Sequence, residues 1–128
     1  MKKNKNVLIA DDDAGIRTLL RMFFEEANYN VLEAKDGEEA WHILESTGVD
    51  LGIFDLNMPN LDGLELTERI RKDKRYCELP ILMLTIKALV DDQIQGLKRG
   101  VDEYVAKPFE KDVLMAKVRA LERRMTTK

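Results

Sequence analysis

The sequence contains one cysteine, one histidine, three prolines and no long hydrophobic run. The single cysteine, Cys77, has no partner for a disulfide within the chain, which suits a reducing cytoplasm. No apolar run approaches the roughly 18 residues of a membrane-spanning helix. Near the start only Val7–Ala10 is apolar before three aspartates follow, which is too short for a secretory signal. We therefore expect a cytoplasmic protein that is neither exported nor inserted in a membrane.

The sequence also lacks a large excess of charge of either sign. It contains 24 acidic and 21 basic residues, so its net charge is −3. An acidic balance argues against direct nucleic-acid binding by this chain. At 128 residues, with 45% hydrophobic and 35% charged residues, the chain has the size and composition of one globular domain. It has no internal repeat, low-complexity tract or interdomain linker. We expect a single domain over residues 1–128, with its core between about Val7 and Arg124.

Short apolar runs of strand length alternate with segments whose apolar residues recur at helical spacing. The weakest helical pattern lies before Gly100, where only Ile94 and Leu97 recur. A clear closing helix follows the last strand, with Val113 and Leu121 among its apolar positions. The expected strands are Val7–Ala10, Asn30–Ala34, Leu51–Phe54, Ile81–Leu84 and Glu103–Ala106.

Five strands that alternate with helices predict an α/β fold, with a parallel sheet covered by helices on both faces. Right-handed crossovers leave few topologies for such a sheet. Ligand sites in these sheets lie beyond the carboxyl ends of the strands. The residues at those ends therefore carry the functional prediction.

Polar side chains of matched chemistry stand at four of the five strand ends. Asp11 and Asp12 follow the first strand and Asp55 follows the third. Grouped carboxylates repel one another unless a cation lies between them, and hard oxygen ligands favour Mg²⁺. A carboxylate can also act as a nucleophile and form an aspartyl-phosphate. Lys107 and Thr85, at the ends of the fifth and fourth strands, would then bind phosphoryl oxygens.

These residues carry a resemblance to a known family. Asp11-Asp12, Asp55-Leu56-Asn57-Met58-Pro59 with Asp62-Gly63, Thr85, and Lys107-Pro108-Phe109 resemble the motifs of the response regulator receiver domain of two-component signalling systems. The match runs from about Val7 to Arg124, and four separated motifs fit in order. The resemblance implies a doubly wound, flavodoxin-like (βα)5 domain with a five-stranded parallel sheet in the order 2-1-3-4-5, as in the chemotaxis regulator.

The resemblance also implies a role for each carboxylate. Asp55 would be the phosphorylation site. Asp12, Asp55 and the backbone carbonyl of Asn57 would hold Mg²⁺, and Asp11 would act through metal-bound water. Asp13, by contrast, is expected to cap the helix that begins near Ala14.

The remaining motif residues receive roles in phosphate binding and in signalling. Lys107 would bind the phosphoryl group, and Thr85 with Tyr104 would form the output switch. The Lys107–Pro108 peptide bond is expected to be cis, which sequence alone makes a minority outcome.

The implied function is a phosphorylation-dependent switch. A sensor histidine kinase or a phosphotransfer protein would donate the phosphoryl group, and the domain would catalyse its own phosphorylation and slow dephosphorylation without being an enzyme for a separate substrate. The surface formed by the helix from about Val90 to Arg99, the strand Glu103–Ala106 and the closing helix would then control an effector domain or partner protein.

Three positions bear on the details of this function. Ile86 stands where the family usually has a small residue, and a bulky side chain there would narrow access to Asp55. Lys87 adds a cation that would influence water attack on the phosphoryl group. The closing segment from Lys117 to Arg124 resembles receivers that continue into DNA-binding or other effector domains.

Relatives with DNA-binding domains dimerise through salt bridges on the same surface, so a homodimer is an open expectation. Two positions lack the charge that the pattern requires, Gln93 and Val113. The positions that fit the pattern are Asp102, Glu103, Lys117 and Arg119.

Three alternatives compete with this interpretation. A hydrolase of the aspartyl-phosphate type would need an acid where Asn57 stands. A flavin-binding electron carrier would need a phosphate-binding loop after the first strand, where three aspartates would repel a phosphate. A degenerate receiver used as a scaffold would lack some of the expected site residues, and none is lacking here.

Overall fold

A computed structural model describes residues 4–86 and 99–126, and within them the expected α/β fold is confirmed. The five strands form one parallel sheet in the order β2-β1-β3-β4-β5. The helix expected from about Val90 to Arg99 falls almost entirely on residues 87–98, outside the described residues, as do Lys87 and Gln93. The elements are β1 (Asn6–Ala10), α1 (Ala14–Glu26), β2 (Asn30–Ala34), α2 (Gly37–Ser46), β3 (Leu51–Asp55), α3 (Gly63–Arg71), β4 (Ile81–Thr85), β5 (Glu103–Ala106) and α5 (Lys111–Thr126).

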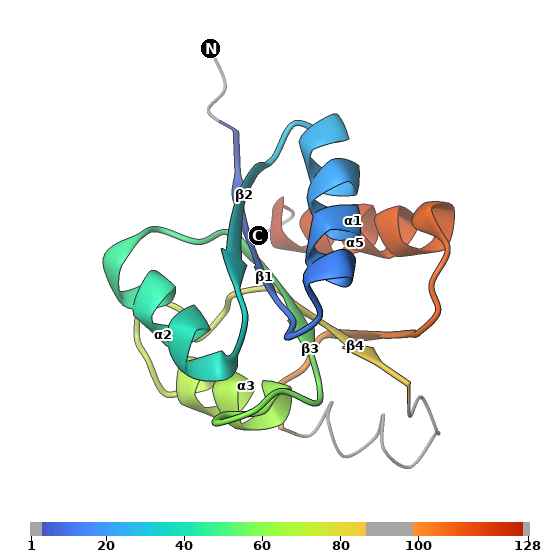
Figure 1. The fold of residues 1–128 in the computed structure, drawn as a ribbon. Coiled ribbons are helices and arrows are strands. Elements are labelled where there is room, and N and C mark those ends of the chain that lie inside the picture. The colour runs from blue at the N-terminus through green and yellow to red at the C-terminus, as the bar shows by residue number, and fades with distance from the viewer. Residues whose placement is uncertain (1–3, 87–98, 127–128) are drawn as a thin grey trace.

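Helices cover both faces of the sheet (Figure 1). Helices α1 and α5 pack on one face through Leu20, Phe24, Leu114, Val118 and Leu121. Helices α2 and α3 pack on the other through Ala40, Leu44, Leu66 and Ile70. Every residue of β3 and β4 is buried, as expected for the middle of a parallel sheet covered on both sides. The buried sheet is thus a rigid support for the side chains at the ends of its strands.

Three helices begin at an aspartate that caps the first turn. The Asp13 carboxylate accepts hydrogen bonds from Gly15 N at 2.8 Å and Ile16 N at 3.2 Å, which confirms its expected role as the cap of α1. Asp36 caps α2 in the same way, and Asp62 forms a reciprocal capping box with Glu65 at the start of α3. These aspartates therefore fix where the helices begin.

Two strands run one residue further than the hydrophobic pattern predicts. The third and fourth strands include Asp55 and Thr85, because the sheet hydrogen bonds continue past the apolar run. Leu56 N donates to Leu84 O at 2.9 Å, and Lys107 N donates to Thr85 O at 2.9 Å. Asp55 and Thr85 are consequently the last residues of β3 and β4 and do not lie in loops.

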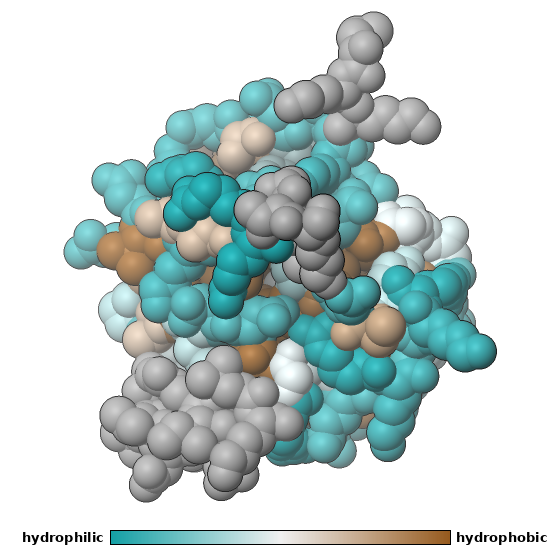
Figure 2. Space-filling view, turned by 180° about the vertical axis from the view of Figure 1, so that it is seen from behind, coloured by the Kyte–Doolittle hydropathy of each residue, from teal (hydrophilic) through white to brown (hydrophobic). Residues whose placement is uncertain are grey.

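Hydrophilic side chains cover most of the face seen from behind the view of Figure 1, and hydrophobic residues appear there only in separate patches (Figure 2). Within the described part of the chain, no helix combines the length and the apolar character needed to span a bilayer.

Candidate functional site

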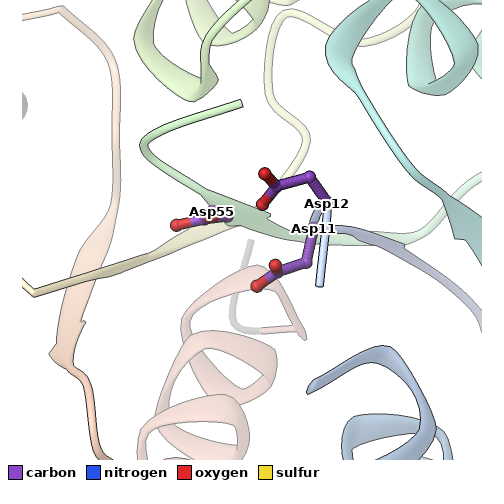
Figure 3. Close-up of side chains that lie close together, drawn as sticks. All are labelled: Asp11, Asp12 and Asp55. Atoms are coloured by element: carbon purple, nitrogen blue, oxygen red, sulfur yellow. The ribbon is translucent and has the colours of Figure 1, made fainter. Parts of the chain in front are cut away.

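Three carboxylates meet at the carboxyl edge of the sheet. Asp11 and Asp12 directly follow β1, and Asp55 ends β3, the strand beside it. One oxygen of each carboxylate lies within 4.8 Å of an oxygen of the other two. Figure 3 shows the three side chains turned to the same side of the strand ends. Asp11 and Asp55 are buried, whereas Asp12 is exposed, so the cluster opens toward solvent on the Asp12 side.

Lys107 supplies a positive charge to this cluster. Its Nζ lies 2.9 Å from Asp11 Oδ2 and 3.3 Å from Asp55 Oδ1, so one ammonium group bridges two buried carboxylates. Burial works against the charge of Lys107, but the hydrogen bond from its ammonium to Asp11 and the charges of Asp11 and Asp55 outweigh it, and the net effect is a raised pKa. The peptide bond after it, Lys107–Pro108, is cis as the resemblance implies.

Asp55 is the carboxylate whose ionisation costs most. Burial, followed by the neighbouring charge of Asp11, raises its pKa from 3.8 to about 6, although Lys107 and a backbone hydrogen bond from Asn57 act in the opposite direction. Lys107 therefore compensates only part of the negative charge at this edge. A second cation beside Asp55 would relieve both the burial cost and the repulsion.

The turn after β3 is held close to the end of that strand. Gly63 N donates to Leu56 O at 2.9 Å, which closes the loop containing Asn57. A Cβ on Gly63 would lie 2.5 Å from Asp55 O and 2.6 Å from Met83 Sδ, so only glycine fits where α3 begins. This close approach fixes the backbone on both sides of Asn57, the residue whose carbonyl the resemblance makes a metal ligand.

Thr85 and Tyr104 occupy neighbouring strands. Thr85 ends β4, is buried, and pairs in register with Ala106 of β5. Tyr104 is two residues earlier on β5, pairs with Met83, and is buried in the core on the α2–α3 side of the sheet. Ile86, directly after Thr85, is 71% exposed. Thr85, expected to bind the phosphoryl group, and Tyr104, expected to respond to it, therefore lie on two strands whose backbones are hydrogen-bonded to each other.

Two charged residues near the site were missed by the sequence reasoning. Arg17 on α1 donates from Nη1 to the backbone carbonyl of Asp11 at 2.7 Å, and its Nε contacts Glu33 Oε1 on β2 at 3.2 Å. The usable signal was the spacing of Arg17 and Arg21, which places two guanidinium groups on one face of the first helix.

Three of the four charges expected to form dimer salt bridges, those of Asp102, Glu103 and Lys117, are paired within the chain. Asp102 pairs with Arg71 at 3.0 Å, and Glu103 pairs with Lys117 at 3.3 Å. A dimer on this surface would have to exchange these pairs for contacts with a second copy.

Comparison with known proteins agrees with the geometry. Residues 7–119 match the family described as the response regulator receiver domain. The response regulator GtcR of Aneurinibacillus migulanus is 40% identical over 94% of this chain and 49% of its own length. The phosphate regulon transcriptional regulatory protein PhoB of Pseudomonas aeruginosa is 38% identical over 94% of this chain and 52% of its own length. The chain spans about half the length of these curated relatives.

Solved structures show the same fold over nearly their whole length. The chemotaxis response regulator CheY4 of Vibrio cholerae is 30% identical with a TM-score of 0.88, covering 92% of this chain and 98% of its own. The receiver domain of the Francisella response regulator 1452 is 35% identical with a TM-score of 0.87, covering 95% and 99%.

The fold and the acidic strand-end site thus define a flavodoxin-like signalling domain. The chain belongs to the response regulator receiver domain family of two-component signalling. Members of this family are signalling proteins.

Proposed function

We propose that this domain is a phosphorylation-controlled switch that accepts a phosphoryl group on Asp55 from a histidine kinase or a phosphotransfer protein. One observation carries the proposal: Asp55 is a buried carboxylate on a rigid strand end, 3.3 Å from Lys107 and within 4.8 Å of two further carboxylates. A structural ion pair needs one carboxylate for one ammonium group. Three carboxylates around one lysine indicate a site built to bind further positive charge.

The donor set fits Mg²⁺. All three side chains offer oxygen, and burial together with the charge of Asp11 raises the pKa of Asp55 to about 6, so a divalent cation would relieve a cost already present. Asp12, Asp55 and the Asn57 carbonyl would hold the ion, and Asp11 would bind it through water. When bound, Mg²⁺ would neutralise charge on the transferring phosphoryl oxygens.

The transfer itself places each described residue in a role. An Asp55 oxygen attacks phosphorus while the bond from phosphorus to the donor's imidazole nitrogen breaks, so the imidazole leaves with the electron pair. Lys107 holds a phosphoryl oxygen, and the Thr85 hydroxyl donates to another. These groups position and neutralise charge, the two effects that dominate phosphoryl transfer. Later attack by water releases phosphate and restores Asp55, which gives the domain its slow self-dephosphorylation.

The output surface is proposed to comprise the segment from about Val90 to Arg99, β5 and α5. Thr85 pairs in register with Ala106 of β5, the strand that also carries Tyr104, so a movement of Thr85 toward the phosphoryl group would displace β5 and Tyr104 with it. The partner would be an effector domain or protein, and a homodimer through this surface would use Asp102, Glu103, Lys117 and Arg119. We place the protein in the cytoplasm, where two-component phosphotransfer occurs.

Labelling with a small phosphodonor tests the assignment of Asp55. Wild-type protein incubated with acetyl phosphate and Mg²⁺ should gain the mass of one phosphoryl group, and a chelator should prevent the gain. Asp55→Asn preserves side-chain size and removes the nucleophile, so it should gain nothing. Asp50→Asn, just before the opposite end of the same strand, is the matched control and should label like wild type. Full labelling of Asp55→Asn would assign the phosphoryl group to another residue.

A further inference from the structure

We propose that Arg17 is a positioning residue for the metal-binding turn, and that Glu33 holds Arg17 in place. The inference rests on the proposed function, because it concerns the turn whose carboxylates would bind Mg²⁺. Neither residue belongs to the cluster of carboxylates itself. Their contacts nevertheless reach the backbone between Asp11 and Asp12.

Arg17 contacts the Asp11–Asp13 turn at both of its ends. Its guanidinium Nη1 donates to Asp11 O at 2.7 Å, and its backbone N–H donates to Asp13 O at 3.1 Å. The guanidinium group is partly buried, with 19% of the side chain exposed. One residue of α1 therefore anchors the first and the last carbonyl of the turn.

The bond to Asp11 O bears directly on the two carboxylates. This carbonyl belongs to the planar peptide group that joins Asp11 to Asp12, so its direction sets one backbone torsion of each residue. The Asp11 side chain is fixed separately, because its Oδ1 accepts from Asp13 N at 2.9 Å and its Oδ2 from Lys107. The exposed side chain of Asp12 has its direction set mainly by this backbone.

Glu33 determines where the Arg17 guanidinium lies. It stands on β2, in register with Ile9 of β1, and its carboxylate accepts from Arg17 through Oε1. Its other oxygen accepts from Arg21 Nε at 2.6 Å. These ion pairs are partly exposed, so each contributes little to global stability. Their main effect is to restrict the geometry of the guanidinium that bonds to Asp11.

A purely structural role, in which this cluster only ties α1 to β2, makes a different prediction. Arg21 provides the matched control, since it lies one turn later on α1 and shares Glu33. Arg21 also bonds to Glu25 and to the carbonyl of Val31. No hydrogen bond among the described residues joins it to the turn of Asp11 to Asp13. If the cluster only ties α1 to β2, substituting Arg21 should weaken Mg²⁺ binding and labelling at least as much as substituting Arg17.

Calorimetric titration with Mg²⁺ alone, together with the rate of labelling by acetyl phosphate, tests the proposal. Arg17→Gln should weaken Mg²⁺ binding by about tenfold, the effect typical of losing a group that orients a metal ligand, and should slow labelling in step. Arg21→Gln should stay within twofold of wild type in both measurements. Glu33→Gln keeps Arg17 but removes the charge that holds its guanidinium group in place. This variant should give an intermediate loss of Mg²⁺ affinity.

Amide exchange adds a readout that does not depend on the metal. The Asp13 amide, which donates to the Asp11 carboxylate, should exchange faster in Arg17→Gln than in Arg21→Gln without Mg²⁺. Unchanged Mg²⁺ affinity in a folded Arg17→Gln, or equal losses in Arg17→Gln and Arg21→Gln, would overturn the positioning role while leaving the proposed function intact. Failure of the wild-type protein to bind Mg²⁺ or to label would overturn the proposed function, and this inference with it.

Discussion

Among single residues, Asp55 governs the electrostatics of the site. Its carboxylate is buried beside Asp11, and one ammonium group serves both. A buried negative charge that is not fully compensated lowers the stability of the folded chain, as charged groups at functional sites commonly do. The metal-free protein should therefore be less stable than a variant in which this charge is missing.

The pH dependence of that effect has a defined sign. Because the pKa of Asp55 is raised from 3.8 to about 6 in the folded state, the native protein binds more protons than the unfolded chain between these values. The contribution of protonated Asp55 to stability is complete below pH 3.8 and is lost as the pH rises through 6. In metal-free buffer, Asp55→Asn should exceed wild type in free energy of unfolding by about 2 kcal/mol at pH 7.5.

Urea denaturation in EDTA at pH 7.5, 6 and 5 provides the measurement. The advantage of Asp55→Asn should shrink as the pH falls. If Asp55→Asn exceeded wild type by the same free energy of unfolding at every pH, burial and the charge of Asp11 would not raise the pKa of Asp55.

Sequence reasoning found the charged groups that stand directly at strand ends and missed those that act through backbone. Asp11, Asp12 and Asp55 were expected at one edge because parallel strands end there, and the resemblance supplied the strand order that makes their two strands neighbours. Arg17 and Arg71 were not found, because each donates to backbone carbonyls, which every residue carries, and because their charged partners Glu33 and Asp102 lie 16 and 31 residues away in the sequence. The roles assigned to Thr85 and Tyr104 came from the resemblance and remain predictions.

At the scale of elements, the last residue of α3 joins three segments far from the site. Arg71 donates to Gly100 O at 2.9 and 2.6 Å and to Leu79 O at 2.7 Å, and it pairs with Asp102 at 3.0 Å. The same carboxylate accepts from Ile81 N, so the starts of β4 and β5 are tied to α3 at the edge opposite the aspartates. This arginine is partly buried, and its planar guanidinium group donates from three nitrogens to acceptors on two carbonyls and one carboxylate.

Arg71→Ala should lower the free energy of unfolding by about 3 kcal/mol, because it leaves several carbonyls and a partly buried carboxylate without their donor. Arg71→Lys should recover only part of the loss, since one ammonium group does not reach all these acceptors. Chemical denaturation measures both variants.

Arg69→Ala on the same helix is the control. Arg69 is exposed, pairs with Glu38 and stacks over Trp41, so its loss should cost less than about 1 kcal/mol. Equal losses for the Arg71 and Arg69 variants would show that the bonds to Gly100 and Leu79 contribute nothing.

The strand boundaries and the start of the first helix followed from the sequence to within a residue, for a physical reason. Buried parallel strands are short continuous apolar runs, and aspartate caps mark where helices begin. The strand ends at Asp55 and Thr85 were misjudged because ladder hydrogen bonds involve backbone and continue under a polar side chain. Asp55 and Thr85 are polar and yet buried within the paired strands, so a run of apolar residues underestimates where each strand ends.

For the molecule as a whole, the proposed signal must cross from the site to the β5–α5 surface. Thr85 and Tyr104 lie on adjacent strands, and Lys117 of α5 donates to the carbonyl of Tyr104 at 3.1 Å. A displacement that begins at Thr85 would therefore reach β5 through the pairing with Ala106, and α5 through the contact of Lys117 with Tyr104. The strand order behind this continuity was expected only through the family resemblance, because strand–helix alternation alone leaves several topologies open.

Beryllofluoride, a mimic of the phosphoryl group, tests this transmission. In wild type, its addition with Mg²⁺ should change amide exchange in β5 and α5. Thr85→Ala should still bind the mimic but show a much smaller change there, because the donor that follows the phosphoryl group is missing.

Thr67→Ala serves as the control, since Thr67 is a buried threonine whose hydroxyl donates to Gly63 O inside α3. It should respond like wild type. Equal responses in wild type and Thr85→Ala, or changes confined to α2 and α3, would contradict the proposed route.

The contact between Lys107 and Asp11 joins positions 96 residues apart in the chain. During synthesis on the ribosome, Asp11, Asp12 and Asp55 emerge well before Lys107 does. Until Lys107 emerges, any approach of the acidic strand ends is opposed by repulsion, because the lysine that offsets their charge is still missing. We expect β5 to dock last, so that the acidic site together with its lysine is complete only in the fully folded domain.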